Sequence, residues 1–413
     1  MHQTDHLSFA SFKKTAAQSL FWPLFILLGF LQSCHMKEEP ASVRNLARAT
    51  ATLDSICKYY TVPNTNYLIE DFYQNENGSI DTLNTFKHQS NWNLLAHLSP
   101  YSGMFSSVNV LISASNNEKY QVFLNSKVLK GLESYFDPNR IPLGYSSAVN
   151  IEMQNASDRF YDDNIGLAIY YLEAYAMEKN VAYLNKAKLL WKFVETGMDE
   201  KLGGGIYWSE QSRDSKNTCV NSSAPVLALK LFEITKDSLY FHQGKKIYEW
   251  TKSHLQDPKD HLYYDNIRLD GTISKSKYSY NSGYMMHAAI LLYKLTSDST
   301  YLKEAQTIAQ SAYHFYFFNY KKPGEKGFRM KKIGSIWFTA ILLRGYVDLY
   351  KIDGNRIYLD TYQKNLDYVW EHGRDRYGFF SINWSKDCQH YRKWILTQTA
   401  FVEMYARMAL VNL

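Results

Sequence analysis

The sequence is poor in cysteine, proline and glycine, and each shortage excludes a class of protein. Its 413 residues include 4 cysteines, 9 prolines and 20 glycines. A disulfide-stapled scaffold needs more cysteine, and a fibrous or low-complexity chain needs far more proline or glycine. Long apolar runs are also missing, since none reaches the roughly 18 residues of a membrane-spanning helix. The sequence therefore predicts a globular chain that can bury a large core.

An excess of charge of one sign is missing as well. The chain has 46 Lys and Arg against 40 Asp and Glu, a net charge of +6 that is spread without a basic block. A nucleic-acid binder concentrates positive charge along a phosphate-tracking surface, so we exclude a nucleic-acid partner. Aromatic residues are abundant instead, with 34 tyrosines and 9 tryptophans. Most aromatic rings fill cores between helices, but exposed rings also offer flat platforms for sugars.

The N-terminus has the layout of a secretory signal peptide. Two lysines precede a short apolar segment at residues 20–31, and Cys34 follows closely. A segment of this length with a basic flank is removed on export and does not span a membrane. We therefore expect a signal peptide at residues 1–33, a tether at residues 34–41 and a single folded domain at residues 42–413.

The residues around Cys34 resemble a bacterial lipoprotein box. In Leu31-Gln32-Ser33-Cys34 the cysteine would become the lipidated first residue, although small or aliphatic residues are usual where Gln32 stands. The following His35-Met36-Lys37-Glu38-Glu39 resembles the acidic surface-export tag of Bacteroidetes lipoproteins. Several acyl chains on one cysteine anchor a protein stably. We expect an outer-membrane lipoprotein at the cell surface or facing the periplasm, with an ordinary signal peptide as the alternative.

Three cysteines remain once Cys34 is lipidated. The remaining cysteines are odd in number and lie far apart in sequence, at Cys57, Cys219 and Cys388. This spacing indicates neither a disulfide framework nor a zinc site. We expect all three to be buried thiols.

A repeat of about 60 residues runs along the chain. Tyr120, Tyr183, Tyr240, Tyr301 and Tyr358 are separated by 63, 57, 61 and 57 residues, and four of the five follow a short polar turn. Such turns suit a tight connection between two helices and the N-cap of the second helix. Apolar-periodic runs of helical length lie on both sides of each turn. Each repeat is therefore predicted to be a pair of antiparallel helices.

Twelve helices follow from this pattern, and six pairs fit a closed ring better than an open solenoid. We predict an all-α fold, an (α/α)6 barrel in one domain, with short turns on one face and long loops on the other. The helices are expected near residues 42–60, 102–116, 119–136, 162–179, 181–197, 218–236, 238–255, 280–297, 299–318, 334–351, 356–372 and 391–411. The long loops are expected at residues 203–217, 257–277, 319–334 and 373–391.

The informative polar residues stand at the starts of the predicted inner helices, on the long-loop face. An Asp pair before an apolar run can be a helix cap and nothing more, and each other motif could be a turn. Repeated at matching places, however, their rings, amides and carboxyls converge on one bowl. Rings stack on pyranose faces, amides bind hydroxyls, and two carboxyls can break a glycosidic bond, as a neutral polysaccharide requires. The motifs are Tyr161-Asp162-Asp163-Asn164, the glycine-rich Gly203-Gly204-Gly205-Ile206-Tyr207-Trp208, Lys216-Asn217-Thr218 with Asn221, and Tyr280-Asn281-Ser282-Gly283.

These motifs, together with Tyr101-Ser102-Gly103-Met104-Phe105, resemble glycoside hydrolase family 76, the endo-α-1,6-mannanases, in family order and over essentially the whole mature chain. The resemblance implies an (α/α)6 barrel, no required cofactor, and hydrolysis of the α-1,6-mannose backbone of fungal or yeast mannan with retention. It implies Asp162 as nucleophile and Asp163 as general acid/base. The residues that it implies for substrate binding are Tyr161, Trp208, Asn217, Asn221, Tyr280 and Asn281.

The physics of the Asp pair agrees with two different roles. A helix N-terminus lowers the pKa of one carboxylate, whereas a second carboxyl beside a like charge has a raised pKa, as an acid needs. Which aspartate takes which role rests on the resemblance alone. Adjacent Cα atoms are about 3.8 Å apart, so the carboxyls can reach the roughly 5–5.5 Å separation of retaining glycosidases. One departure concerns Ile165 and Gly166, where the family commonly has Ala-Trp, so a ring that would contact sugar is absent.

Three other features have ordinary explanations. Asp265 could contact sugar, although a loop turn is the expected role. His287 is expected inside the barrel, and no His/Asp/Glu cluster has metal spacing, so we predict no metal. The Lys-rich residues 321–332 are expected to form a solvated loop.

The leading interpretation is a monomeric, membrane-anchored endo-α-mannanase whose partner is α-mannan. One alternative is a non-catalytic glycan-binding lipoprotein on the same scaffold, which Gly166 favours and the intact Asp pair disfavours. Another is a different (α/α)6 carbohydrate enzyme. An unsaturated-uronide hydrolase would need basic residues in the cleft, and a sugar epimerase would need paired catalytic histidines. Neither set is evident in the sequence.

Overall fold

The structure is a computed structural model, and its described residues all belong to the unit Glu39–Leu413. It describes residues 39–74, 95–149, 157–322, 324, 326–384 and 392–411. The predictions for the signal peptide, for Cys34 and for Cys388 lie outside these residues.

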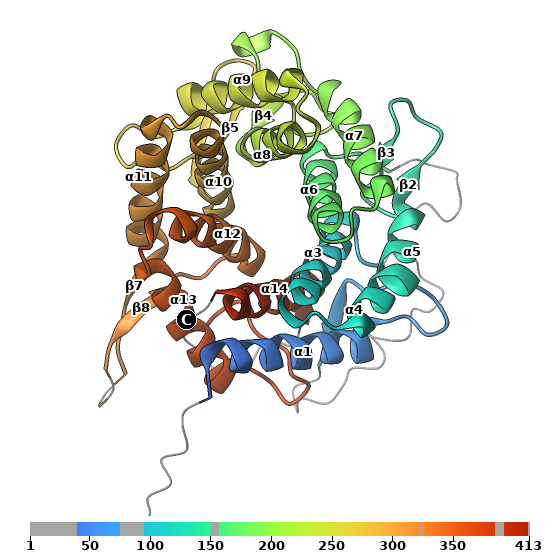
Figure 1. The fold of residues 1–413 in the computed structure, drawn as a ribbon, viewed down its shortest axis with the longest axis vertical. Coiled ribbons are helices and arrows are strands. Elements are labelled where there is room, and N and C mark those ends of the chain that lie inside the picture. Colours follow the sequence, from blue (N-terminus) through green and yellow to red (C-terminus); the bar gives the residue numbers. More distant parts are fainter. Residues whose placement is uncertain are drawn as a thin grey trace, which may run out of the picture. The chain divides into compact units, whose positions relative to one another are not determined.

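Two concentric rings of helices form an (α/α)6 barrel, as the repeat predicts (Figure 1). The first helix, α1, packs against the last, α14, which closes the ring. The inner helices are α3 (Leu98–Ser115), α6 (Tyr161–Glu178), α8 (Thr218–Thr235), α10 (Ser279–Thr296), α12 (Ile336–Asp353) and α14 (Ile395–Leu410).

The outer ring contains one irregular member. The outer partner of α3 was expected to be one helix, but a π-helical turn and a final 3-10 turn interrupt it. This partner consists of α4 (Glu118–Phe123), η2 (Leu124–Val128), α5 (Leu129–Leu132) and η3 (Glu133–Tyr135). The regular outer helices are α1 (Ala41–Tyr60), α7 (Val181–Glu195), α9 (Ser238–Leu255), α11 (Ser299–Tyr316) and α13 (Ile357–His372).

The short turns explain the tyrosine repeat. After α8 the backbone of Lys236 turns into the left-handed region at φ 61°, and Asp237 then accepts a hydrogen bond from the N–H of Leu239 and caps α9. Ser297 and Asp298 do the same between α10 and α11. Two residues therefore suffice to end an inner helix and begin an outer one.

The long loops contain strands that the sequence analysis missed. Two predictions are thereby corrected. The Lys-rich residues 321–332, expected to form a solvated loop, include the second strand of a β-hairpin, and the last helix begins at Ile395 instead of near residue 391 because a strand precedes it. Antiparallel partners that lie far apart in the chain stabilise such strands, and helical periodicity gives no sign of them. The strands are β1 (Asp71–Tyr73), paired with β9 (Arg392–Trp394); β2 (Phe136–Asp137), with β3 (Gly144–Tyr145); β4 (Ser215–Asn217), β5 (Tyr264–Arg268) and β6 (Ile273–Lys277), in that order; and β7 (Phe317–Tyr320), with β8 (Phe328–Lys331).

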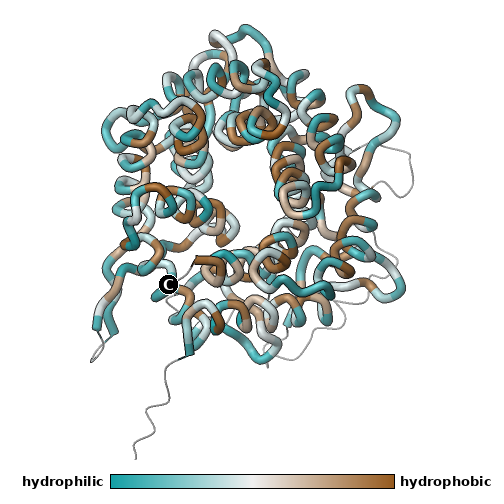
Figure 2. The backbone as a smooth tube through the Cα atoms, in the orientation of Figure 1, coloured by the Kyte–Doolittle hydropathy of each residue, from teal (hydrophilic) through white to brown (hydrophobic). Residues whose placement is uncertain are grey.

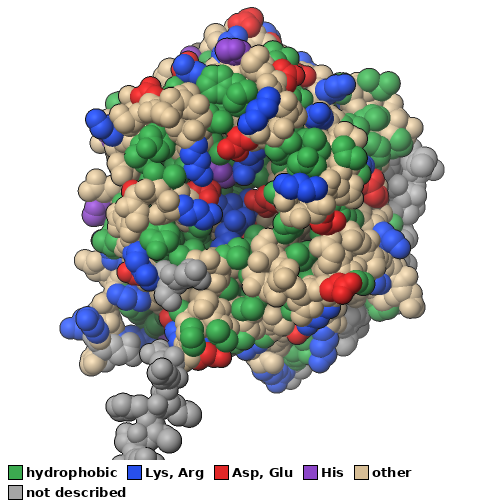
Figure 3. Space-filling model, in the orientation of Figure 1, with side chains coloured by type: hydrophobic (Ala, Val, Ile, Leu, Met, Phe, Trp, Pro, Cys, Tyr) green, Lys and Arg blue, Asp and Glu red, His purple; other side chains and the backbone are tan. Residues whose placement is uncertain are grey.

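Hydrophobic stretches run along the inner helices (Figure 2), and most of their residues are buried. Charge also lies inside the ring: Arg344 of α12 forms a buried ion pair with Glu403 of α14 and donates a hydrogen bond to Ser106 of α3. Figure 3 shows one face of the ring, which is hollowed at its centre, where lysine and arginine side chains gather. In the part of the chain that the structure describes, no helix has both the length and the apolarity to cross a membrane.

Candidate active site

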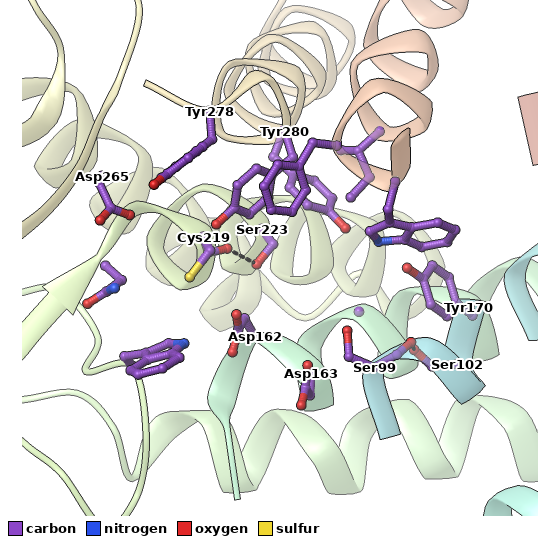
Figure 4. Close-up of a pocket in the computed structure, with 17 residues that line it drawn as sticks. Ser99, Ser102, Asp162, Asp163, Tyr170, Cys219, Ser223, Asp265, Tyr278 and Tyr280 are labelled. Carbon is purple, nitrogen blue, oxygen red and sulfur yellow. Dashed lines mark hydrogen bonds between the residues drawn. The ribbon is translucent and has the colours of Figure 1, made fainter. Parts of the chain in front are cut away.

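A pocket of about 470 Å³ opens among the first turns of the inner helices and the loops that precede them (Figure 4). Six different segments contribute to its wall: α3, α6, the glycine-rich loop, the β4–α8 and β5 region, α10 and α12. The lining residues are Ser99, Ser102, Asp162, Asp163, Gly166, Tyr170, Trp208, Asn217, Cys219, Ser223, Asp265, Tyr278, Tyr280, Tyr284, Trp337, Phe338 and Ile341.

The Asp pair lies in the first turn of α6 and faces this pocket. The N-cap of α6 is Phe160, and no side chain caps the helix. Asp162 and Asp163 extend into the pocket beside the serines of α3 and the thiol of Cys219 (Figure 4). The pair is therefore not the N-cap of α6, and both carboxyls can meet a ligand.

Two buried side chains fix the start of α6. Asn164 accepts a hydrogen bond from the N–H of Tyr145 and donates to the carbonyls of Tyr145 and Phe160. Arg159, which is fully buried, forms an ion pair with Glu210 in the loop beyond Trp208. These contacts leave the first turn of α6 little freedom to move, which holds the carboxyls in place.

Trp208 stands beside the Asp pair at the edge of the pocket. Its carbonyl accepts a hydrogen bond from the N–H of Tyr161 at 3.0 Å, and its ring lies 4.9 Å from that of Phe160. Trp208 lines the pocket, and the residue is 40% exposed. Trp208 can therefore serve as the predicted stacking platform.

Lys216 and Trp250 contact the glycine-rich loop and hold it in place. The ammonium of Lys216 is buried, donates to the carbonyl of Gly204 at 2.5 Å and pairs with Asp199 at 2.6 Å. Gly205 has φ of +81°, and a Cβ there would lie 2.7 Å from the ring of Trp250. Glycine is required at this position, both for its backbone conformation and for its closeness to the ring.

The two carboxyls differ in their surroundings. Burial and the charge of Asp162 raise the pKa of Asp163 well above its usual range. Burial also raises the pKa of Asp162, but hydrogen bonds from Cys219 and Trp208 oppose this rise. A carboxyl that keeps its proton can act as an acid, and one whose charged form accepts hydrogen bonds suits a nucleophile. This asymmetry has the direction of the predicted roles.

Asp163 faces the start of α3. The Ser99 hydroxyl and the charge of His97 both oppose the rise in the pKa of Asp163. The hydrogen bond that the side chain of His97 donates to the Glu70 carboxylate is the main cause of the raised pKa of His97, and the charge of Asp163 adds to this rise. The raised pKa favours the protonated imidazole of His97, which lies near Asp163 and is not among the residues that line the pocket.

An aromatic wall lies opposite the Asp pair. Tyr280 stacks on Phe338 with ring centroids 3.9 Å apart, and Tyr278, 39% exposed, packs edge-on against Phe338 at 5.8 Å. The sequence analysis predicted Tyr280 but missed Tyr278 and Phe338. Phe338 lies inside an apolar helix, where its helical spacing is that of a core residue.

Five predicted site residues come together in the pocket: Asp162, Asp163, Trp208, Asn217 and Tyr280. Their predicted roles as catalytic or sugar-binding groups stay predictions.

Three predicted site residues lie in the barrel wall and not in the pocket lining. Tyr161 stacks on Phe193 at 4.8 Å and Asn221 binds both backbone groups of Ile206, while the side-chain amide of Asn281 is buried and has no hydrogen-bond partner among the described residues. Tyr161 and Asn221 thus hold elements of the site, and no contact of theirs with the pocket is seen.

Asp265 and Cys219 are pocket residues that the sequence analysis placed elsewhere. Asp265 lies in strand β5, not in a loop turn, and burial raises its pKa. Cys219 is a buried free thiol, as predicted, but its location beside Asp162 was not foreseen. Cys57 is free but only half-buried, so the prediction of a buried thiol is wrong for this residue.

His287 is an interior histidine, as predicted. It lies 3.4 Å from Asp348, and burial lowers its pKa to about 3. Within the described ranges, no three His, Cys, Asp or Glu side chains are grouped so that they could hold a metal ion.

A pocket with an adjacent carboxyl pair and aromatic walls, on an (α/α)6 barrel, defines a glycoside hydrolase. The family model for Glycosyl hydrolase family 76 matches residues 64–329, and the chain belongs to that family.

Solved structures and a curated relative agree with this assignment. The chain is 28% identical to a family 76 mannosidase of Bacteroides thetaiotaomicron VPI-5482, with a TM-score of 0.80 over 89% of this chain and 98% of that one. It is 25% identical to the GH76A α-1,6-mannanase of Salegentibacter sp. HEL1_6, with a TM-score of 0.70 over 89% and 99%. An inactive variant of the latter, with two consecutive aspartates changed to asparagine, was solved with α-1,6-mannotriose.

The curated relative is the mannan endo-1,6-alpha-mannosidase DCW1 of Saccharomyces cerevisiae, 27% identical over 127 residues. The match spans 28% of this chain and 28% of the yeast protein.

Proposed function

We propose that this glycoside hydrolase is an endo-acting α-1,6-mannanase that cleaves the backbone of fungal or yeast mannan with retention. The observation that carries the proposal is the pair Asp162 and Asp163, adjacent in one helical turn, with the higher pKa at Asp163. The α-1,6-manno-oligosaccharide held by the Salegentibacter relative and the endo-1,6 activity in the yeast relative's name support the linkage.

In the first step, the Asp162 carboxylate attacks the anomeric carbon of the mannose at the cleavage point. The glycosidic C–O bond breaks as Asp163 gives its proton to the leaving oxygen, and a mannosyl ester of Asp162 forms. Asp163, now a carboxylate, then takes a proton from water, whose oxygen attacks the same carbon and breaks the ester. Two inversions at that carbon give an α-configured product.

The lining of the pocket fits a neutral sugar. Among the described lining residues there is no lysine or arginine, whereas hydroxyls and aromatic rings are frequent and one amide is present. This composition disfavours an unsaturated-uronide hydrolase, which must bind a carboxylate.

A hydrolysis screen tests the activity. We expect the purified protein to release oligosaccharides from linear α-1,6-mannan and not from other α-linked glycans. Binding of the mannan without release of oligosaccharides would instead support a non-catalytic glycan-binding protein.

Proton NMR in the first minutes of hydrolysis tests retention, before mutarotation mixes the anomers. We expect an α-mannose reducing end to appear first. A β reducing end appearing first would contradict both the mechanism and the roles given to Asp162 and Asp163.

We also propose that the protein is tethered to the outer membrane through a lipidated Cys34, on the basis of the apolar segment at 20–31 and the lipoprotein-like box. Cys34→Ser in the full chain should remove the protein from the membrane fraction or block its processing. An unchanged mature mass and an unchanged fractionation would contradict lipidation.

A further inference from the structure

Gly166 is a helix glycine that packing does not require. It lies inside α6, where glycine is less favourable than alanine because it has more conformational freedom to lose. A Cβ placed on Gly166 would meet no atom closer than the Tyr170 hydroxyl at 3.6 Å, an ordinary van der Waals distance. Alanine would therefore fit at position 166, so close packing does not explain why the residue there is glycine.

The other α-helical glycines among the described residues differ in this respect. For each of them a Cβ would come within 3.1 Å or less of a neighbouring atom, so close packing explains the glycine. The nearest atoms are Leu396 Cδ1 at 2.8 Å for Gly103, the Tyr101 hydroxyl at 1.8 Å for Gly131, Ala228 Cβ at 3.1 Å for Gly244, the Ile341 carbonyl at 2.9 Å for Gly283 and Met286 Cε at 2.6 Å for Gly345.

Gly166 shares a helix face with the Asp pair. It follows Asp163 by three residues and Asp162 by four, and Tyr170 follows it by four, so all four residues lie along one stripe that lines the pocket. Helix side chains lean toward the N-terminus and cover the preceding turn. A side chain at position 166 would therefore extend over the turn that carries both carboxyls.

Polar groups and aromatic rings line the space beside Gly166. Ser99, Ser102 and Tyr170 lie on the Asp163 side of the pocket, and each carries a hydroxyl (Figure 4). Cys219, Tyr280 and Asp265 lie on the other side, toward Asp162. Trp337 also lines the pocket on this side, because its ring would lie 3.5 Å from a Cβ built on Gly103, the neighbour of Ser102. A recess with hydroxyls, an aromatic ring and one glycine suits a sugar, which forms hydrogen bonds through its hydroxyls and packs its ring face on aromatic rings.

We propose that Gly166 is a specificity-determining residue, and that the recess beside Asp163 takes a branch sugar attached to a backbone mannose next to the bond that is cleaved. The inference rests on the proposed mannanase function. A branch on a ring hydroxyl projects sideways from the backbone and needs room close to the carboxyls, which a larger side chain at position 166 would occupy.

The test compares linear α-1,6-mannan with a mannan of the same backbone that keeps its branches. For the unchanged protein we expect kcat/KM values within about threefold of each other, and products that carry a branch on the residue adjacent to the cleaved bond. Gly166→Trp should lower kcat/KM on the branched mannan at least about tenfold more than it lowers kcat/KM on the linear mannan.

Gly166→Ala is the matched control, since it adds a Cβ that fits without filling the recess; it should keep the ratio of kcat/KM values for the two mannans that the unchanged protein has. If Gly166→Trp does not fold, Gly166→Leu takes its place. The ratio of kcat/KM values that the unchanged protein shows for the two mannans tests the inference in either case. An unchanged protein that cleaves linear mannan and leaves branched mannan intact would overturn the inference alone, as would an equal loss on both substrates in the folded variant. A protein that cleaves neither mannan overturns the proposed function itself.

Discussion

At the scale of single residues, the site depends on two neighbouring carboxyls with unlike surroundings. The charge of Asp162 raises the pKa of Asp163, while the Cys219 thiol and the Trp208 indole favour the charged form of Asp162. Since both sit on one turn, small changes in local hydrogen bonding decide which carboxyl holds the proton. Two predictions belong to this scale.

Asp162→Asn and Asp163→Asn should each lower turnover by several orders of magnitude. Neither should lower the melting temperature appreciably, because asparagine has nearly the same shape as aspartate and places no charge in the buried site. On a substrate with an activated phenolic leaving group, Asp163→Asn should keep much of the rate of the first step, and Asp162→Asn should not.

Asp265→Asn is the control for this pair, since Asp265 is a carboxyl of the same pocket outside the pair, and its replacement should lower turnover far less. Near-normal activity in either variant of the pair would show that the pair is not catalytic.

Cys219→Ala should move the acidic limb of the pH profile of kcat/KM to higher pH. The thiol hydrogen bond lowers the pKa of Asp162, so its loss raises that pKa, and protonation then removes the nucleophile at a higher pH. Cys219→Ser, which keeps a donor at the same place, should leave the limb near its original position. Identical pH profiles in all three proteins would assign the thiol to packing only.

At the scale of secondary-structure elements, inner helices bind the loops before them through an amide in their first turn. Asn164 of α6 binds both backbone groups of Tyr145, Asn221 of α8 binds those of Ile206, and Gln398 of α14 binds those of Phe380. Each amide is the fourth residue of its helix. The amides therefore hold the long loops, and with them the pocket walls, against the barrel.

Asn221→Ala tests this role against the predicted sugar contact. It leaves the N–H and C=O of Ile206 without their partner, so the free energy of unfolding should fall by about 2–3 kcal/mol. The KM should change little at temperatures well below the melting point.

Asn217→Ala is the matched comparison, since Asn217 lines the pocket and should give the opposite pattern: a raised KM with little loss of stability. A raised KM and an unchanged melting temperature for Asn221→Ala would restore the sugar contact.

At the scale of the whole molecule, an ion-pair network inside the ring joins helices that are distant in sequence. Glu403 of α14 pairs with Arg344 of α12 and with Arg407, and Arg407 reaches Glu173 of α6 at 3.5 Å. Burial alone would raise the pKa of Glu403, but the charges of Arg344 and Arg407 outweigh it and hold the pKa at about 2. The network therefore depends on an ionised Glu403.

This pKa predicts acid unfolding in a defined window. The folded-state value of about 2 lies below the ordinary 4.5, so the stabilisation is complete above pH 4.5 and is lost as the pH falls toward 2. That loss amounts to about 3 kcal/mol. Denaturant titrations at several pH values would measure it.

Glu403→Gln should destabilise the fold by about 3–5 kcal/mol at pH 7, because Arg344 stays buried without its partner, and it should flatten the pH dependence. Glu249→Gln, in the exposed pair Lys245–Glu249 of α9, should change stability by at most about 0.5 kcal/mol. A pH dependence unchanged by Glu403→Gln would show that other groups cause the acid unfolding.

The sequence alone determined the helix pairs, the closed ring and the location of the Asp pair. Local rules govern these features: a polar turn ends one helix and caps the next, apolar residues recur at helical spacing, and carboxyls in a first turn face the end of the barrel from which the loops emerge. The tyrosine repeat is visible in the sequence without knowledge of any tertiary contact.

Only the tertiary structure decided which side chains meet in the pocket. Asn217 and Asn221 belong to one motif, yet four residues along the chain turn the first toward the pocket and the second toward Ile206. Phe338 joins the pocket wall because α12 packs beside α10, and β5 carries Asp265 there because it pairs with β4. Such encounters depend on how elements distant in sequence pack, whereas the sequence shows only what each element can bury by itself.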